Sequence, residues 1–153
     1  MATPRDAAAA TAIAATFRLD GALAATAIAA VVATSVDLAI EELARRAFAV
    51  PPEFEPFQGT VAPYTIGGVM LAGLAFWLTS RFVRDVARVY PRLAIGALLL
   101  SWIPDLALLV INEPGVSVPA VASLMTMHFA TTAIVTVLLV RMGLRCRVAI
   151  VPR

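Results

Sequence analysis

Three ionisable side chains interrupt long apolar stretches of this sequence: Asp37, Asp105 and His128. A charged group inside membrane hydrocarbon costs about 2.5–3.5 kcal/mol on insertion scales, so such groups usually face the interior of a helix bundle. A carboxylate and an imidazole in contact can relay a proton, act as an acid–base pair or bind a polar ligand. Their chemistry therefore depends on whether the fold brings them together.

Polar residues accompany each of these three groups at helical spacing. Ser101 precedes Asp105 by one turn, and Thr131 and Thr132 follow His128 by one turn. Trp102 is close to Asp105 in sequence and could line a pocket, although filling a core is its commoner role. We predict a small polar pocket in the outer half of the membrane. Its candidate ligand or proton site residues are Asp37, Ser101, Trp102, Asp105, His128 and Thr132.

Four apolar segments must position these residues, at 21–40, 61–80, 93–111 and 118–140. A helix of about 20 residues crosses roughly 30 Å of hydrocarbon. The chain has 153 residues, of which 61% are hydrophobic and 14% charged, whereas a soluble domain is nearer half apolar and a quarter charged, roughly. We predict an all-α, four-helix transmembrane bundle with up-down-up-down topology, forming one integral membrane domain over 1–153.

The distribution of arginine predicts the orientation, because basic residues concentrate on the cytoplasmic side. Lysine is absent, and the external loop 41–60 contains only Arg45 and Arg46. The opposite side carries Arg5, Arg18, Arg81, Arg84, Arg88, Arg92, Arg141, Arg145, Arg147 and Arg153. Both termini are therefore expected in the cytoplasm, and the protein in the inner (plasma) membrane.

The expected helix ends give each ionisable group a depth. At 1.5 Å per residue, Asp105 lies about 9 Å, His128 about 14 Å and Asp37 about 5 Å from the external ends of their helices. The short loop between the last two helices makes them antiparallel neighbours, so Asp105 can contact His128. Three interpretations remain open: a structural hydrogen bond that locks two helices, a ligand or proton site, or an Asp105 that reaches the interface unpaired.

Two connecting segments carry expectations of their own. Three prolines in "PPEFEPFQGT" exclude regular helix from 51–60. Its Phe54 and Phe57 could fold over the mouth of the bundle, but anchoring at the membrane interface is favoured. The segment "RFVRDVARVYPR" is expected to form one helical stripe in which Asp85 pairs with Arg81 and Arg88. Its basic residues Arg81, Arg84, Arg88 and Arg92 are expected to meet anionic lipid headgroups.

Small residues on the second helix predict close helix packing. Gly68 and Ala72 form a small-xxx-small pair, which lets helix backbones approach one another. The pairing could lie within one bundle or between the protomers of a homo-oligomer.

Several motifs together resemble a known family. They are "PDLALL", "ASLMTMHFATTAIV" and "FEPFQG" followed by "YTIGGVMLAGLAFW". The chain resembles, over about 20–140, a domain-of-unknown-function family of small four-span bacterial membrane proteins, commonly actinobacterial. Met127 and His128 match a Met-His pair that recurs in its last helix. The resemblance implies a fold and a membrane location, and no activity.

The remaining motifs restrict the function classes. P-loop, dinucleotide-binding and zincin patterns are absent, and the single cysteine, Cys146, has no metal-ligand spacing around it. No catalytic residue, cofactor, metal or nucleic-acid partner is predicted. The favoured function is a non-enzymatic binder of a lipid-like or small ligand or partner. The alternatives are a small proton-coupled transporter acting as an oligomer and a membrane enzyme that uses an Asp–His pair.

Overall fold

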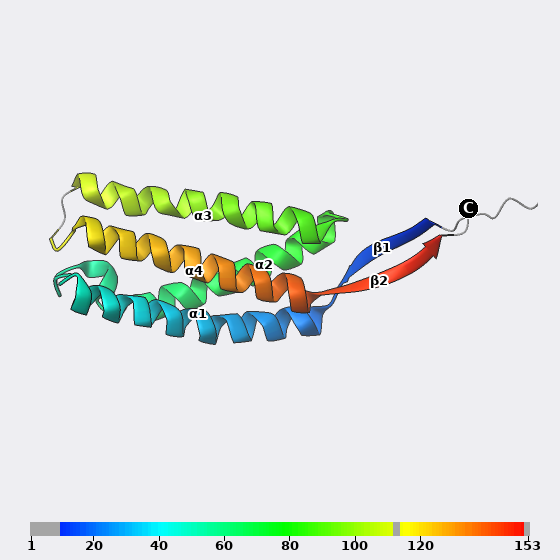
Figure 1. Ribbon diagram of the computed structural model, residues 1–153, viewed down its shortest axis with the longest axis horizontal. Helices are drawn as coiled ribbons and strands as arrows, with labels where there is room; N and C mark the ends of the chain where they lie inside the picture. Colours follow the sequence, from blue (N-terminus) through cyan, green and yellow to red (C-terminus); the bar gives the residue numbers. More distant parts are fainter. Residues whose placement is uncertain (1–9, 112–113, 152–153) are drawn as a thin grey trace, which may run out of the picture.

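The protein is a bundle of four helices (Figure 1). The computed structural model describes residues 10–111 and 114–151. All four helices are long and apolar enough to cross a membrane, so the predicted all-helical membrane bundle is confirmed. The helices are α1 (Leu19–Ala47), α2 (Val61–Phe82), α3 (Val86–Ile111) and α4 (Val118–Gly143).

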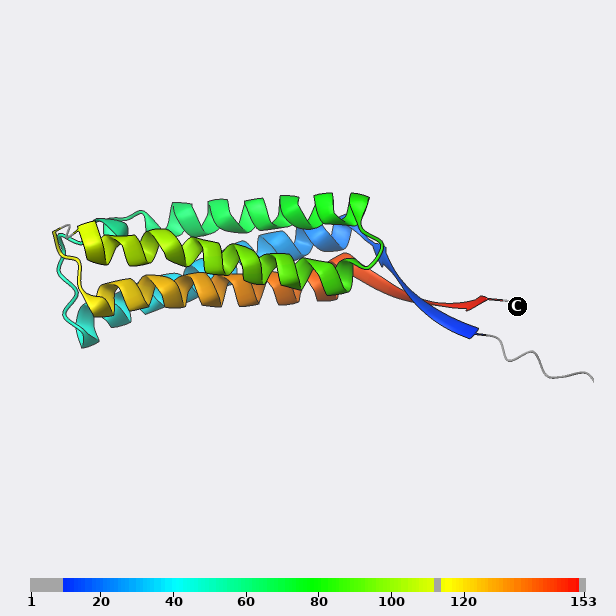
Figure 2. The same ribbon diagram turned by 90° about the horizontal axis from the view of Figure 1, so that it is seen from above.

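The connections divide the bundle into two ends (Figures 1 and 2). At one end lie the α1–α2 connection, which contains the short 3-10 helix η1 (Glu55–Phe57), and the α3–α4 loop. At the other lie the α2–α3 connection and two strands that extend from the bundle. We call residues 50–60 the cap loop, and the two ends the cap-loop end and the strand end.

The first helix is longer than its apolar segment. It continues to Ala47 instead of ending near residue 40, and ion pairs from Glu41 to Arg45 and from Glu42 to Arg46 support its final turns. Asp37 therefore lies ten residues before the end of α1, about 15 Å along its axis. The expected shallow position of Asp37 is wrong, and this residue lies level with the middle of α4.

The strand end contains a two-stranded sheet that the sequence did not predict. Strands β1 (Ala10–Phe17) and β2 (Leu144–Val151) pair antiparallel, with Phe17 opposite Leu144. The backbone N–H of Arg18 donates to the carbonyl of Gly143 at 2.8 Å. The pairing thus continues the contact between the start of α1 and the end of α4.

The α2–α3 connection is a break between helices rather than a continuous stripe. Helix α2 ends at Phe82 and α3 begins at Val86, so the single arginine stripe expected here is wrong. Asp85 accepts the backbone N–H of Arg88 at 3.3 Å, and its carboxylate lies 3.6 Å from that residue's Nε. Arg81 instead lies over the ring of Trp77, 5.2 Å from its centroid.

Small residues bring α1 and α4 close together. Ala25, Ala29 and Ala33 of α1 are completely buried. At the strand end, a Cβ added to Gly21 would lie 2.0 Å from the carbonyl oxygen of Met142, which is backbone and cannot rotate away. This close approach requires glycine at position 21.

Substitution of Gly21 by alanine should therefore destabilise the bundle. The helices must move apart, and such overpacking typically costs about 1–3 kcal/mol. The measurement is unfolding of the detergent-solubilised protein in a denaturing-detergent titration. Gly67→Ala is the matched control, because a Cβ there meets nothing within 4 Å. Equal stabilities of the two variants would contradict the close approach.

Candidate ligand-binding site

The carboxylate of Asp37 joins three helices. Its Oδ2 accepts a hydrogen bond from the hydroxyl of Thr65 on α2 at 2.7 Å and from that of Thr131 on α4 at 2.8 Å. Asp37 is only 3% exposed. Its other oxygen, Oδ1, is buried and has no hydrogen-bond partner in the described part of the chain. A buried acceptor without a hydrogen-bond donor raises the free energy of the folded protein, so a donor that reached Oδ1 would stabilise it.

Asp105 and His128 are in contact, as the short loop between their helices led us to expect. Nδ1 of His128 lies 3.2 Å from Oδ2 of Asp105 and 3.0 Å from the carbonyl oxygen of Leu124. Both neighbours are acceptors, so Nδ1 carries a proton. Its hydrogen is better aligned with Leu124, and the buried Oδ2 of Asp105 is left without a well-formed hydrogen bond.

A cavity of about 870 Å³ lies beside these groups. Its walls come mainly from α2, α3 and α4, and Asp37 reaches it from α1. The ionisable and hydroxyl side chains that line it are Asp37, Glu55, Thr60, Tyr64, Thr65, Tyr90, Ser101, Asp105, His128, Thr131 and Thr132. The acids and His128 lie toward the cap-loop end, so one part of the cavity is polar.

The rest of the cavity is apolar and long. Along α2 its lining extends from Thr60 to Ala75, about 22 Å at the rise of a helix. Tyr90 borders the far end, where its hydroxyl donates to the carbonyl of Ala72 at 3.1 Å and is therefore satisfied. The cavity thus combines a polar pocket with an apolar channel.

The cavity opens sideways between α2 and α3. Leu71 of α2 and Leu93 of α3 both line it, yet they are 66% and 55% exposed. A Cβ added to Gly68 would meet nothing within 4 Å. Gly68 therefore borders open space, whereas Ala72 packs against the core. Close packing on Gly68 within the bundle is not observed, and packing of the pair between protomers stays a prediction.

The cap loop covers the end of the bundle. Phe54 and Phe57 are fully buried, and their rings meet edge to face with centroids 5.0 Å apart. They pack with apolar residues of α1, α2 and α4, among them Ala44, Val61 and Leu124. The favoured expectation, that these aromatics anchor at the membrane interface, is wrong, because burying both rings in the bundle removes more apolar surface from water.

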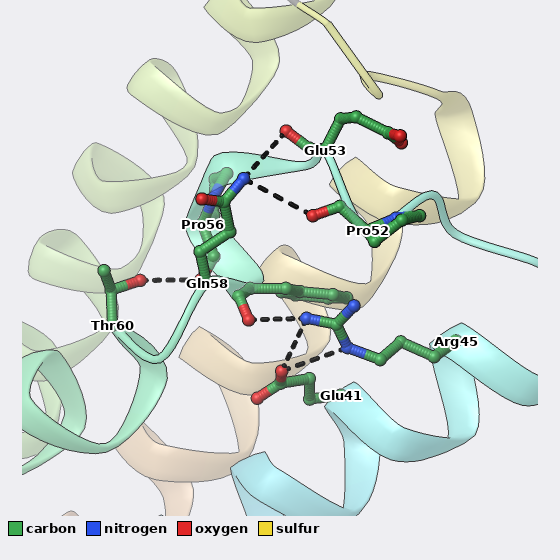
Figure 3. Close-up of polar contacts among 8 residues, drawn as sticks. Glu41, Arg45, Pro52, Glu53, Pro56, Gln58 and Thr60 are labelled. Atoms are coloured by element: carbon green, nitrogen blue, oxygen red, sulfur yellow. Dashed lines mark hydrogen bonds and ion pairs between the residues drawn. The ribbon is translucent and has the colours of Figure 1, made fainter.

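Polar contacts hold the cap loop in place (Figure 3). Arg45 donates to Glu41 at 3.0 Å and to the carbonyl of Phe57 at 2.5 Å, with its guanidinium 5.5 Å from the centre of the Phe57 ring. Gln58 donates to the carbonyls of Pro52 and Glu53. Glu55, Pro56 and Thr60 of this loop line the cavity, so the loop borders it at the cap-loop end of the bundle.

The candidate residues divide into two groups. Five of the six border the cavity: Asp37, Ser101, Asp105, His128 and Thr132. Trp102 does not; its indole N–H donates to the carbonyl of Met125 at 3.2 Å and links α3 to α4. Thr65 was not predicted, although a hydroxyl near the start of the second apolar segment was a visible signal.

Metal-binding groups and similar proteins are the other possible guides to function. Within the described ranges, no group of three or more His, Cys, Asp or Glu side chains is placed to hold a metal ion. No family model, curated protein or solved structure matched the chain. The resemblance to a four-span family stays a prediction, and the function is argued from the cavity.

Proposed function

We propose that this membrane protein binds a lipid-like, amphipathic ligand in the cavity. The ligand's polar end lies beside Asp37, Asp105 and His128, and its apolar part lies between α2 and α3. One observation carries the proposal: a largely apolar cavity of about 870 Å³ is also lined by Asp37, Asp105 and His128. The volume is in the range of ligand pockets, roughly 300–1,000 Å³.

The opening of the cavity favours a ligand that arrives from the membrane. At the cap-loop end the cavity is bordered by Glu55, Pro56 and Thr60, whereas exposed leucines border the gap between α2 and α3. A molecule dissolved in lipid can enter that gap sideways without passing through water. The proposed ligand is therefore one that already resides in the bilayer.

The orientation belongs to the same proposal. Arginines lie at the strand end, on the α2–α3 connection and after α4. This asymmetry supports a cytoplasmic position for the strand end, with the polar pocket toward the outer leaflet of the plasma membrane. Arg81, Arg84, Arg88 and Arg92 then lie near anionic headgroups of the inner leaflet.

One observation favours a second candidate, a proton-coupled carrier that works as an oligomer. Asp37 and Asp105 line one cavity together with His128, and such groups can exchange protons with a passing substrate. A carrier predicts uptake into proteoliposomes that depends on a pH gradient and is lost in Asp105→Asn. A binder predicts a bound molecule and no such uptake.

Binding is tested by a substitution that introduces a bulky side chain at a residue lining the cavity. Gly68→Trp places an indole in the open space beside α2, and Gly96→Trp is the matched control, since its position is also open but does not line the cavity. Molecules extracted from each purified protein are identified by mass spectrometry. In the wild type and Gly96→Trp we expect one amphipathic species that is enriched over bulk lipid. In Gly68→Trp the amount of this species should fall about tenfold or more. A tenfold change corresponds to about 1.4 kcal/mol of binding free energy.

Two results would contradict binding in the cavity. In one, Gly68→Trp retains the species as well as Gly96→Trp does. In the other, all three proteins carry only the lipid mixture of the membrane from which they were purified.

A further inference from the structure

We infer that the polar end of the ligand is a cationic, donor-rich group such as an ammonium, and not a phosphate. This inference rests on the proposed function, because it specifies what the same cavity binds. It follows from the charges around the cavity and from the hydrogen-bonding state of its polar atoms.

The charge around the cavity is acidic. Asp37, Asp105 and Glu55 line it, and His128 is the single lining side chain that can become cationic in the described part of the chain. The sequence has no lysine, and no arginine of the described ranges lines the cavity. The nearest basic group named above, Arg45, is held by Glu41 and the Phe57 carbonyl.

The free polar atoms deepest in the pocket are acceptors. Oδ1 of Asp37 and Oδ2 of Asp105 are buried without a well-formed hydrogen bond. Several lining hydroxyls already donate within the protein: Thr65 and Thr131 to Asp37, Ser101 to Leu98, Thr60 to Pro56 and Tyr90 to Ala72. The pocket therefore accepts hydrogen bonds more readily than it donates them.

These two features select the headgroup. An ammonium carries three donors and a positive charge, so it can donate to the acids that line the cavity and offset their charge. A phosphate carries only acceptors and would lie beside three acids without an arginine or lysine to bind it. A neutral hydroxyl, with one donor, is intermediate.

Three probes with the same chain separate these headgroups: hexadecylamine, 1-hexadecanol and hexadecyl phosphate. Each is titrated into delipidated, full-length protein in a neutral detergent, and bound probe is counted by native mass spectrometry. We expect the amine to bind most tightly and the phosphate most weakly, with the amine favoured by about tenfold or more, since hydrogen bonds to charged groups are worth that much in affinity.

Asp37→Asn tests the role of the orphaned oxygen while keeping the shape of the side chain. The amide oxygen can still accept from Thr65 and Thr131, whereas the amide N–H₂ replaces the free Oδ1. We expect amine affinity to fall about tenfold. Asp20→Asn removes the same charge from an exposed position on α1 and should leave affinity unchanged. Asp105→Asn is the second variant if Asp37→Asn does not fold.

The outcomes separate this inference from the proposed function. Equal binding of amine and phosphate, or an Asp37→Asn protein that binds the amine as Asp20→Asn does, overturns the ammonium headgroup. If Gly68→Trp still blocks every probe in that case, the cavity binds ligands but the headgroup class is wrong. If Gly68→Trp blocks none of them, the proposed function itself fails.

Discussion

Replacing Phe54 with alanine should lower the free energy of unfolding by about 3–5 kcal/mol, the usual cost of truncating a fully buried phenylalanine. Phe54 is 0% exposed and packs against the ring of Phe57. The α3–α4 loop also approaches it, because a Cβ on Gly115 would lie 2.7 Å from the backbone nitrogen of Phe54. Loss of this ring therefore loosens two loops at the cap-loop end.

Phe48→Ala is the matched control, since Phe48 lies just after α1 but is 58% exposed. Its stability should remain within about 0.5 kcal/mol of the wild type, as for most surface substitutions. Both variants are compared in the denaturing-detergent titration used for Gly21→Ala. A Phe54→Ala protein as stable as Phe48→Ala would show that the cap loop does not seal the bundle.

His128→Ala should destabilise the protein by about 1–3 kcal/mol, because it removes the donor closest to the buried carboxylate of Asp105 and leaves that acceptor unsatisfied. Asp105 is buried, and the contact with Nδ1 of His128 is its nearest opposite charge among the described residues. The double variant Asp105→Leu/His128→Ala removes that unsatisfied carboxylate as well. It should recover much of the stability lost in His128→Ala alone.

The wild type, the single variants Asp105→Leu and His128→Ala, and the double variant form a double-mutant cycle, whose coupling energy measures the Asp105–His128 interaction. We expect about 1–3 kcal/mol, as is found for residues in contact. Effects that add to within about 0.5 kcal/mol would show that the two side chains act independently. Amine binding measured on the same proteins tests whether the pair serves the ligand as well as the packing of α3 and α4.

The helices could be predicted because each depends on local composition. Twenty apolar residues in a row are sufficient evidence for a spanning helix, and the four predicted segments all lie within observed helices. The end of α1 could not be fixed from composition, because its last turns are stabilised by the Glu41–Arg45 and Glu42–Arg46 pairs rather than by apolar residues. The break after Phe82 was missed because the sequence spacing of the arginines is compatible both with one continuous helix and with two consecutive helices.

The site was predictable only where the chain forces adjacency. A short loop makes α3 and α4 neighbours, so Asp105 and His128 could be paired from depth alone. The hydrogen bond from Thr65 to Asp37 could not be predicted. The cap loop between α1 and α2 does not fix how the two helices are aligned along their axes, and only the packing of Phe54 and Phe57 does so. The same is true of β1 and β2, whose pairing joins residues more than a hundred positions apart.

A crystal structure of the protein grown from a lipidic mesophase is the most direct test of the cavity. We predict that α2 and α3 are held apart at Gly68, with elongated density between them that ends beside the carboxylate of Asp37. A structure in which α3 packs directly on Gly68 and leaves no space beside Asp37 and Asp105 would contradict this prediction.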